Sequence, residues 1–261
     1  MKTRPHKNVL ASLREHPLRW SIVRDGMQWT AIGLLVIAAG LFLSILSFAV
    51  RDWSGVFAAT LAVMGGLTLV TGSLLAIIGF VQCLLVPNAA PRILFLSGFL
   101  VACYSAYSMS QLFYRFGGGR SGFSDFEDIL QLSQMTQIPT TILSLLANLL
   151  IVVGFLALAA DIGSRKTVKR IRIYWLVQFG GSLLLIGLVV LVAPFVSSFG
   201  NRSTMRIIIP LLLGAFALGY TLLLLFMQSS ILRGLRTELS ALAYQAERAT
   251  PEADDDEWIS V

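Results

Sequence analysis

Six long runs of hydrophobic residues, separated by short polar stretches, make up most of the chain. They cover residues 27–50, 55–86, 93–114, 140–160, 174–197 and 207–232. Each run has at least the ~20 residues that an α-helix needs to cross ~30 Å of hydrocarbon. Pro87 and Pro91 lie between the second and third runs, where residues that interrupt helices are tolerated. The pattern predicts an all-α fold: a polytopic integral membrane protein with a six-helix transmembrane bundle.

Three polar segments flank or interrupt this predicted membrane domain of residues 27–232. Residues 1–26 form a basic arm in which Val9, Leu10 and Leu13 share one helical face, and an interfacial helix is expected after Pro17. Residues 115–139 are expected to form an external amphipathic loop. Residues 233–261 continue the helical spacing of leucines beyond the sixth run and end in an acidic tail. We therefore expect a cytosolic helical extension followed by a disordered end.

The composition supports the membrane class. Hydrophobic residues make up 56% of the chain and charged residues only 13%, about half the usual ~25% of globular domains. The net charge of +6 does not favour nucleic acid as a partner, because the basic residues lie beside apolar runs and not in a soluble basic domain. We expect anionic lipid headgroups to contact the basic arm and the loop at residues 165–172.

The distribution of basic residues predicts the orientation. Fifteen of the 20 Lys and Arg residues lie in the two terminal segments and in the loops after the second and fourth runs. The other three loops share the remaining five. Because cytoplasmic loops are enriched in Lys and Arg, the sequence predicts a cytoplasmic membrane with both termini in the cytosol.

Small residues recur at seven-residue intervals within the runs, which predicts close helix packing. Such a period keeps one face of a helix turned toward a neighbour, and glycine on that face lets two backbones approach. The second run shows the pattern most fully. The packing positions that we infer are Gly33, Gly40, Ala58, Gly65, Gly72, Gly79, Gly154, Gly180 and Gly187.

Residues for most catalytic and metal chemistries are missing from the runs. Both histidines, His6 and His16, precede the first run, and Cys83 and Cys103 have no metal-binding spacing. Residues 119–122 spell GRSG, similar to the nucleophile motif of rhomboid proteases, but they lie in a glycine-rich loop with no histidine nearby in the sequence. We predict no catalytic, cofactor or metal site, and no enzyme activity.

A few polar residues lie within the predicted spans. Tyr104, Ser108 and Gln111 share a face of the third run, and together with Asn148 they form either an interhelical hydrogen-bond seam or a solute path. Near the cytosolic ends of four runs lie Gln82, Asp161, Gln178 and Gln228. These four either line a vestibule or are simply hydrated near the headgroups. Asp161 also precedes Arg165 by four residues, a spacing that permits an ion pair on one helix.

Two functional hypotheses follow. The first is a non-enzymatic membrane component that assembles with membrane-protein partners, or with copies of itself, through its glycine-rich faces. The second is a small-solute permease or the membrane subunit of a transporter, which would use the polar seam and the vestibule.

Overall fold

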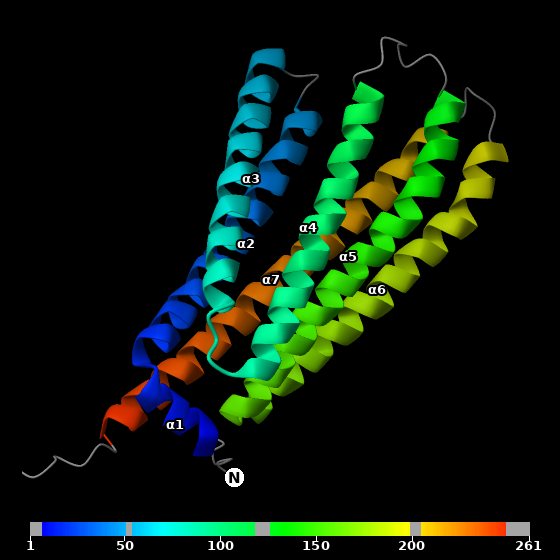
Figure 1. Cartoon of the computed structure of the whole chain (residues 1–261). Helices are drawn as coiled ribbons and strands as arrows, with labels where there is room; N and C mark the ends of the chain where they lie inside the picture. The colour runs from blue at the N-terminus through cyan, green and yellow to red at the C-terminus, as the bar shows by residue number, and fades with distance from the viewer. Residues whose placement is uncertain (1–6, 51–53, 118–125, 199–204, 249–261) are drawn as a thin grey trace, which may run out of the picture.

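The computed structural model describes residues 7–50, 54–117, 126–198 and 205–248; next to the gaps, parts of the helices are described by their backbone alone. The described residues form seven helices (Figure 1). Their bounds are α1 (Lys7–Glu15), α2 (Pro17–Ala49), α3 (Gly55–Cys83), α4 (Ala89–Gly117), α5 (Phe126–Ile162), α6 (Arg165–Ser198) and α7 (Met205–Arg248).

The predicted all-α fold is confirmed, and the apolar helices are consistent with the predicted membrane class. Among the described residues, four helical stretches are long and apolar enough to cross a membrane: Pro17–Ser47, Gly55–Cys83, Ile142–Ile162 and Leu212–Arg248. A shorter apolar stretch, Ala89–Ser105, belongs to α4. Each of the six predicted runs falls mainly within one of the helices α2 to α7.

Helix boundaries differ from the prediction at several places. Helix α2 starts at Pro17 and continues into the first run, so the segment after Pro17 and the first run form one helix. Helix α5 starts at Phe126, which makes much of the expected loop at 115–139 helical. Helix α7 continues from Met205 to Arg248, as the leucine spacing beyond the sixth run predicts. In α5 the backbone remains helical through Pro139, the residue at which the predicted loop ends. The acidic tail lies outside the described residues.

The helices are arranged as an antiparallel hairpin beside a three-helix group (Figure 1). Helices α2 and α3 form the hairpin, and α4, α5 and α6 form the group. Helix α7 runs behind both and packs against α2 and α6. Helix α1, the start of α2, the α5–α6 turn and the end of α7 all lie at the lower end in this view. This end contains the segments that the sequence marks as basic, and we call it the basic end.

Glycines at seven-residue intervals bring α2 and α3 into backbone contact. A Cβ added to Gly33 would lie 2.7 Å from the carbonyl oxygen of Gly72, and one added to Gly72 would lie 2.9 Å from that of Gly33. One pair of glycines toward the basic end, Gly26 and Gly79, and one pair away from it, Gly40 and Gly65, repeat this reciprocal contact. Ala58 and Ser47, the next positions of the two stripes, are both buried. The two stripes therefore face each other along most of the hairpin.

The other predicted glycine positions divide into two groups. A Cβ on Gly154 would meet the ring of Phe95 at 2.8 Å, so this glycine admits an aromatic side chain from α4 into α5. That ring also lies 4.8 Å from the ring of Phe155. In contrast, Gly180 and Gly187 on α6 have nothing within 4 Å of an added Cβ. The seven-residue spacing on α6 is present, but the rotation of this helix turns both glycines away from its described neighbours.

Most of the fully buried side chains lie at the basic end. Val9 and Leu13 of α1 are buried there with Val23 of α2 and with Leu235 and Leu239 of α7. Trp20 at the start of α2 donates a hydrogen bond from Nε1 to Ser12 Oγ at 3.2 Å. The apolar faces of the arm and of the C-terminal extension therefore pack against each other.

The glycine contacts predict a large effect of Gly72→Leu. The new side chain would meet the backbone and side chain of Ile37, which cannot yield without separating the helices. We expect the free energy of unfolding to fall by about 3 kcal/mol, the upper range for overpacked sites. Thermal unfolding of the purified protein in mild detergent measures this.

Gly66→Leu provides the matched control, because Gly66 lies on the same helix with nothing within 4 Å of its Cβ position. Its melting temperature should equal or exceed that of the unchanged protein. An equal decrease in melting temperature for the two variants would contradict the packing role of Gly72.

Candidate functional site

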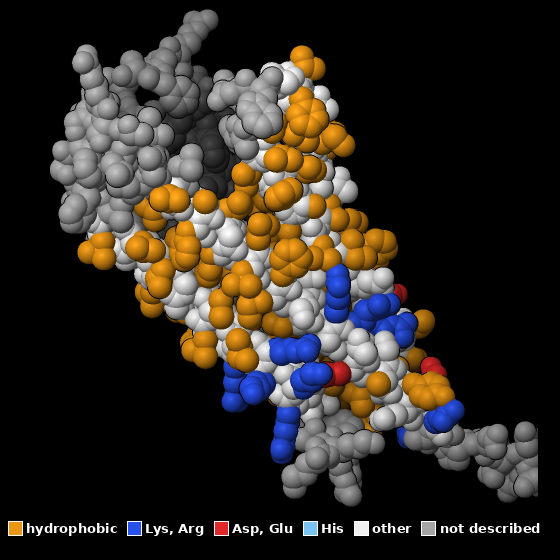
Figure 2. All heavy atoms as spheres, turned by 180° about the vertical axis from the view of Figure 1, so that it is seen from behind, with side chains coloured by type: hydrophobic (Ala, Val, Ile, Leu, Met, Phe, Trp, Pro, Cys, Tyr) orange, Lys and Arg blue, Asp and Glu red, His pale blue; other side chains and the backbone are white. Residues whose placement is uncertain are grey.

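The basic end carries most of the charged groups of the described chain. Figure 2 shows Lys and Arg side chains gathered at this end, below a broad band of hydrophobic side chains. Hydrophobic side chains across that band are exposed, among them Val56, Val63 and Leu67 of α3 and Leu183 of α6. This separation is typical of a bundle with its middle in hydrocarbon and its basic end among headgroups.

A tight turn between α5 and α6 organises the polar contacts of this end. Gly163 has a φ of 78°, a left-handed conformation that favours glycine. The amide of Gly163 donates to Ala160 O, and that of Ser164 donates to Ala159 O, both at 3.0 Å. These two bonds close α5 as a Schellman motif. Ser164 then caps α6, because its Oγ accepts a hydrogen bond from the Thr167 amide at 3.1 Å.

The same serine binds a carboxylate of α7. Ser164 Oγ donates to Glu238 Oε1 at 2.5 Å. Thr167, whose side chain is only 1% exposed, places its Oγ1 3.0 Å and 3.1 Å from the two oxygens of Glu238. The Glu238 carboxylate therefore accepts hydrogen bonds from two neutral hydroxyls. This contact fixes α7 against the start of α6.

A second carboxylate is also held by a neutral donor. Asn88, in the connection between α3 and α4, donates from Nδ2 to Asp161 Oδ2 at 2.9 Å. The ion pair considered between Asp161 and Arg165 is not formed in the described structure. The physical reason is the turn at Gly163, which ends α5 between the two residues and removes the helical four-residue geometry.

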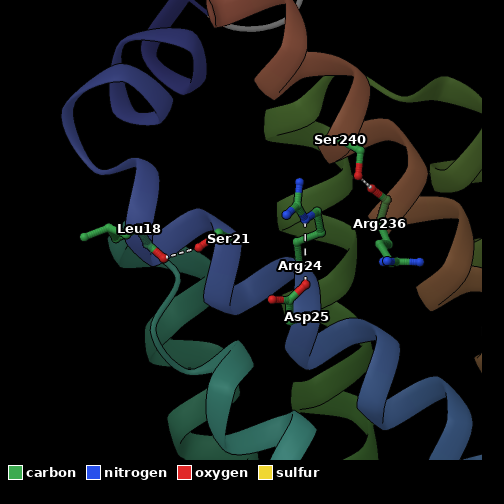
Figure 3. A network of polar contacts seen from close by, with 6 residues as sticks. All are labelled: Leu18, Ser21, Arg24, Asp25, Arg236 and Ser240. Atoms are coloured by element: carbon green, nitrogen blue, oxygen red, sulfur yellow. Dashed lines mark hydrogen bonds and ion pairs between the residues drawn. The ribbon is translucent and has the colours of Figure 1, made fainter.

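Most arginines at this end are consequently without an ion pair to another described residue. Within the described part of the chain, one ion pair is found, between Arg24 Nε and Asp25 Oδ1 at 3.8 Å. Figure 3 shows Arg24 of α2 and Arg236 of α7 in the region where these helices face each other. The Nε atoms of both are buried and have no hydrogen-bond partner among the described residues. The described residues therefore leave the positive charge of this end incompletely neutralised.

Two cavities open at the basic end. The first, of about 470 Å³, lies between α2, α6 and α7 and is lined by Leu35, Arg170, Phe226, Ser229, Ser230, Arg233, Gly234 and Thr237. The second, of about 530 Å³, lies between α1, α2 and α7, and its lining includes Arg14, Trp20, Arg24 and Glu247. Both cavities combine apolar walls with arginine.

The polar residues predicted from the sequence are not brought together in either cavity. Gln82, Asp161, Gln178 and Gln228 line neither one. Gln178 is buried on α6, where its backbone carbonyl accepts a hydrogen bond from Tyr220 Oη at 2.6 Å. Gln82 and Gln228 are partly buried on separate helices. The four residues therefore do not line a common cavity among those described here.

The predicted seam is only partly described. Tyr104 is 60% exposed on α4. Asn148 donates its side-chain amide to the carbonyl of Ser144, one turn back in its own helix, at 3.0 Å. The side chains of Ser108 and Gln111 lie outside the described residues. The bond to Ser144 occupies one of the donors that Asn148 would use toward α4.

Sequence reasoning missed Ser164, Thr167 and Glu238. A local signal for the first two does exist, because Gly163-Ser164 separates two apolar runs and Ser164 precedes Thr167 by the three-residue spacing of an N-cap. Nothing local identifies Glu238 as their partner, since it lies 74 residues from Ser164. Arg233 was counted only as a topology-determining charge, whereas Arg170 also belongs to the loop that was expected to contact anionic headgroups.

The hydrogen bonds of Glu238 predict that Glu238→Ala destabilises the bundle. Removal of the carboxylate leaves the buried hydroxyl of Thr167 without its acceptor, which should cost about 2 kcal/mol. Thermal unfolding in mild detergent measures the loss. Glu247→Ala on the same helix is the control, because Glu247 is exposed. A loss no larger than that of the control would show that the contact contributes nothing to stability.

The chemistry of this end suits the binding of anions. Both hydrogen-bonded carboxylates are held by neutral donors, and among the described residues no three His, Cys, Asp or Glu side chains form a group that could hold a metal ion. Exposed guanidinium groups beside apolar walls suit the binding of anions that carry apolar groups. In comparisons with known proteins, the chain matches no protein-family model, no curated protein and no solved structure.

Proposed function

We propose that this protein is a non-enzymatic, six-span membrane component that assembles with a second copy of itself through α6. The observation that carries the proposal is the open glycine face of this helix. Gly180 and Gly187 have nothing within 4 Å of an added Cβ, and Leu176 and Leu183 on the same side are exposed.

The face of α6 has the spacing of the α2–α3 interface. Leu176, Gly180, Leu183 and Gly187 follow one another at alternating intervals of four and three residues. Gly72, Ala76 and Gly79 on α3 have the same intervals, and Gly72 and Gly79 contact α2. Left-handed helix packing requires this alternation. A self-complementary face suits a two-fold dimer, the commonest oligomer, in which the same patch is used twice.

The six-span topology is part of the proposal. Four spans are recognised by length and hydropathy, and α4 and α6 supply the other two, because residues 93–114 and 174–197 are predominantly apolar and contain no charged residue. The grouping of basic residues at one end supports a cytosolic location for that end in a cytoplasmic membrane.

The permease alternative has less support from the contacts. It requires a polar path along Tyr104 and Asn148 toward Gln178. The Asn148 amide bonds within its own helix, and the two cavities described above are lined by other residues. Assembly is therefore the preferred function.

The topology predicts a cytosolic C-terminus. Green fluorescent protein fused after Val261 should fluoresce in a bacterial host, because it matures in the cytosol and not after export in unfolded form. Alkaline phosphatase at the same place should be inactive, and phosphatase inserted between Arg120 and Ser121 should be active. The opposite pattern would overturn the orientation.

The dimer predicts that Gly180→Cys cross-links in membranes. In a Cys103→Ser background, in which only the buried Cys83 remains, copper-phenanthroline oxidation should convert most of the Gly180→Cys protein into a dimer on non-reducing gels. A two-fold axis beside α6 brings the two new thiols together. Gly66→Cys, at the open position on α3, should remain monomeric. Equal cross-linking at the two positions, or none at Gly180→Cys, would contradict the α6 interface.

A further inference from the structure

The cavity between α2, α6 and α7 has an apolar part and a cationic part. Leu35 and Phe226 form the apolar wall, whereas Arg170, Arg233 and Thr237 lie toward the basic end. Phe226 and Arg233 are separated by two helical turns, or ~10 Å along α7. The cavity therefore extends along the helix axis from the hydrophobic band to the level of the charged groups.

Neither arginine of this cavity is neutralised by the described residues. The ion pair of the described chain belongs to Arg24 and Asp25, not to Arg170 or Arg233. Glu238, next to Thr237 in the sequence, accepts its hydrogen bonds from Ser164 and Thr167. Two guanidinium groups from different helices thus line one cavity without a carboxylate bound to either.

Gly234 keeps the space between these groups open. A Cβ at this position would lie 3.7 Å from Arg170 Nη1 and 3.7 Å from Thr167 Oγ1. A larger side chain would therefore project beside the Arg170 guanidinium and fill the cavity that Gly234 lines. The residues that line the cavity, together with the absence of a side chain on Gly234, define a recess in the surface.

We propose that this recess binds one anionic glycerophospholipid. Its phosphate lies between Arg170 and Arg233, since guanidinium groups match phosphate oxygens in charge and geometry. Its acyl chain lies along Leu35 and Phe226, at the depth of the hydrophobic band. The apolar wall selects a lipid over free phosphate. The proposal requires only that the bundle lies in a membrane, and it is independent of the α6 dimer.

The test measures how added lipid changes the melting temperature of the full chain in mild detergent. Tryptophan fluorescence monitors the unfolding. Phosphatidylglycerol should raise the melting temperature in a saturable manner, because a ligand that binds only the folded state stabilises it. Phosphatidylcholine and inorganic phosphate should not. Arg170→Gln with Arg233→Gln should shift the half-saturating phosphatidylglycerol concentration upward by at least about tenfold, since a charge-assisted hydrogen bond is lost at each position.

Two further variants separate the recess from general surface charge. Arg92→Gln with Arg248→Gln removes the same charge from exposed positions that lie outside the 165–172 loop and do not line the cavity, and it should leave the response to phosphatidylglycerol unchanged. Gly234→Leu retains both arginines but fills the recess, and it should abolish the saturable response.

Several outcomes would overturn the proposal. Equal stabilisation by phosphatidylcholine or by inorganic phosphate would contradict an anionic-lipid site. So would an equal loss of response in the two double-arginine variants, or a full response in Gly234→Leu. Cross-linking at Gly180→Cys provides a separate readout, so that failure of the lipid site and failure of the dimer can be distinguished.

Discussion

Close approach of helix backbones is the constraint on which this structure depends. Lipid tails are as apolar as the side chains of the helices, so burial of apolar surface does not hold two helices together in a membrane. Helices α2 and α3 meet the constraint with reciprocal glycine contacts, as between Gly33 and Gly72. At these contacts the carbonyl oxygen of one helix lies where a side chain of the other would otherwise be. Such an interface tolerates no added atoms on its contact side, while the opposite side of α3 faces outward and is apolar.

The bundle uses a second type of packing at its basic end. There the helices are joined by buried aliphatic side chains such as Leu235 and Leu239, as in a soluble protein, and by hydrogen bonds between distant segments. Helix α7 connects the two regions, because it packs against α2 and α6 and extends to α1. The glycine hairpin and the basic end therefore form one continuous structure. A change in the position of α7 would act on both regions.

The hydrogen bonds of the carboxylates influence which arginines of the basic end form ion pairs. Asp161 and Glu238 accept from amide and hydroxyl groups, which carry no charge to offset theirs. Arg170 and Arg233 are thereby left available to anions from outside the chain. Headgroups of anionic lipids are the most abundant such anions at a cytoplasmic membrane surface. The proposed lipid recess and the predicted orientation thus have the same electrostatic origin.

The sequence by itself determined the all-helical class and the approximate position of each long apolar helix, because the length and polarity of an apolar run are local properties. It also determined where glycines recur at seven-residue spacing. Only the tertiary structure decided which of these stripes meet: those of α2 and α3 face each other, whereas Gly180 and Gly187 remain open. It likewise brought Glu238 to Thr167, 71 residues away. Both outcomes depend on the rotation of each helix about its axis and on its neighbours, which no local pattern encodes.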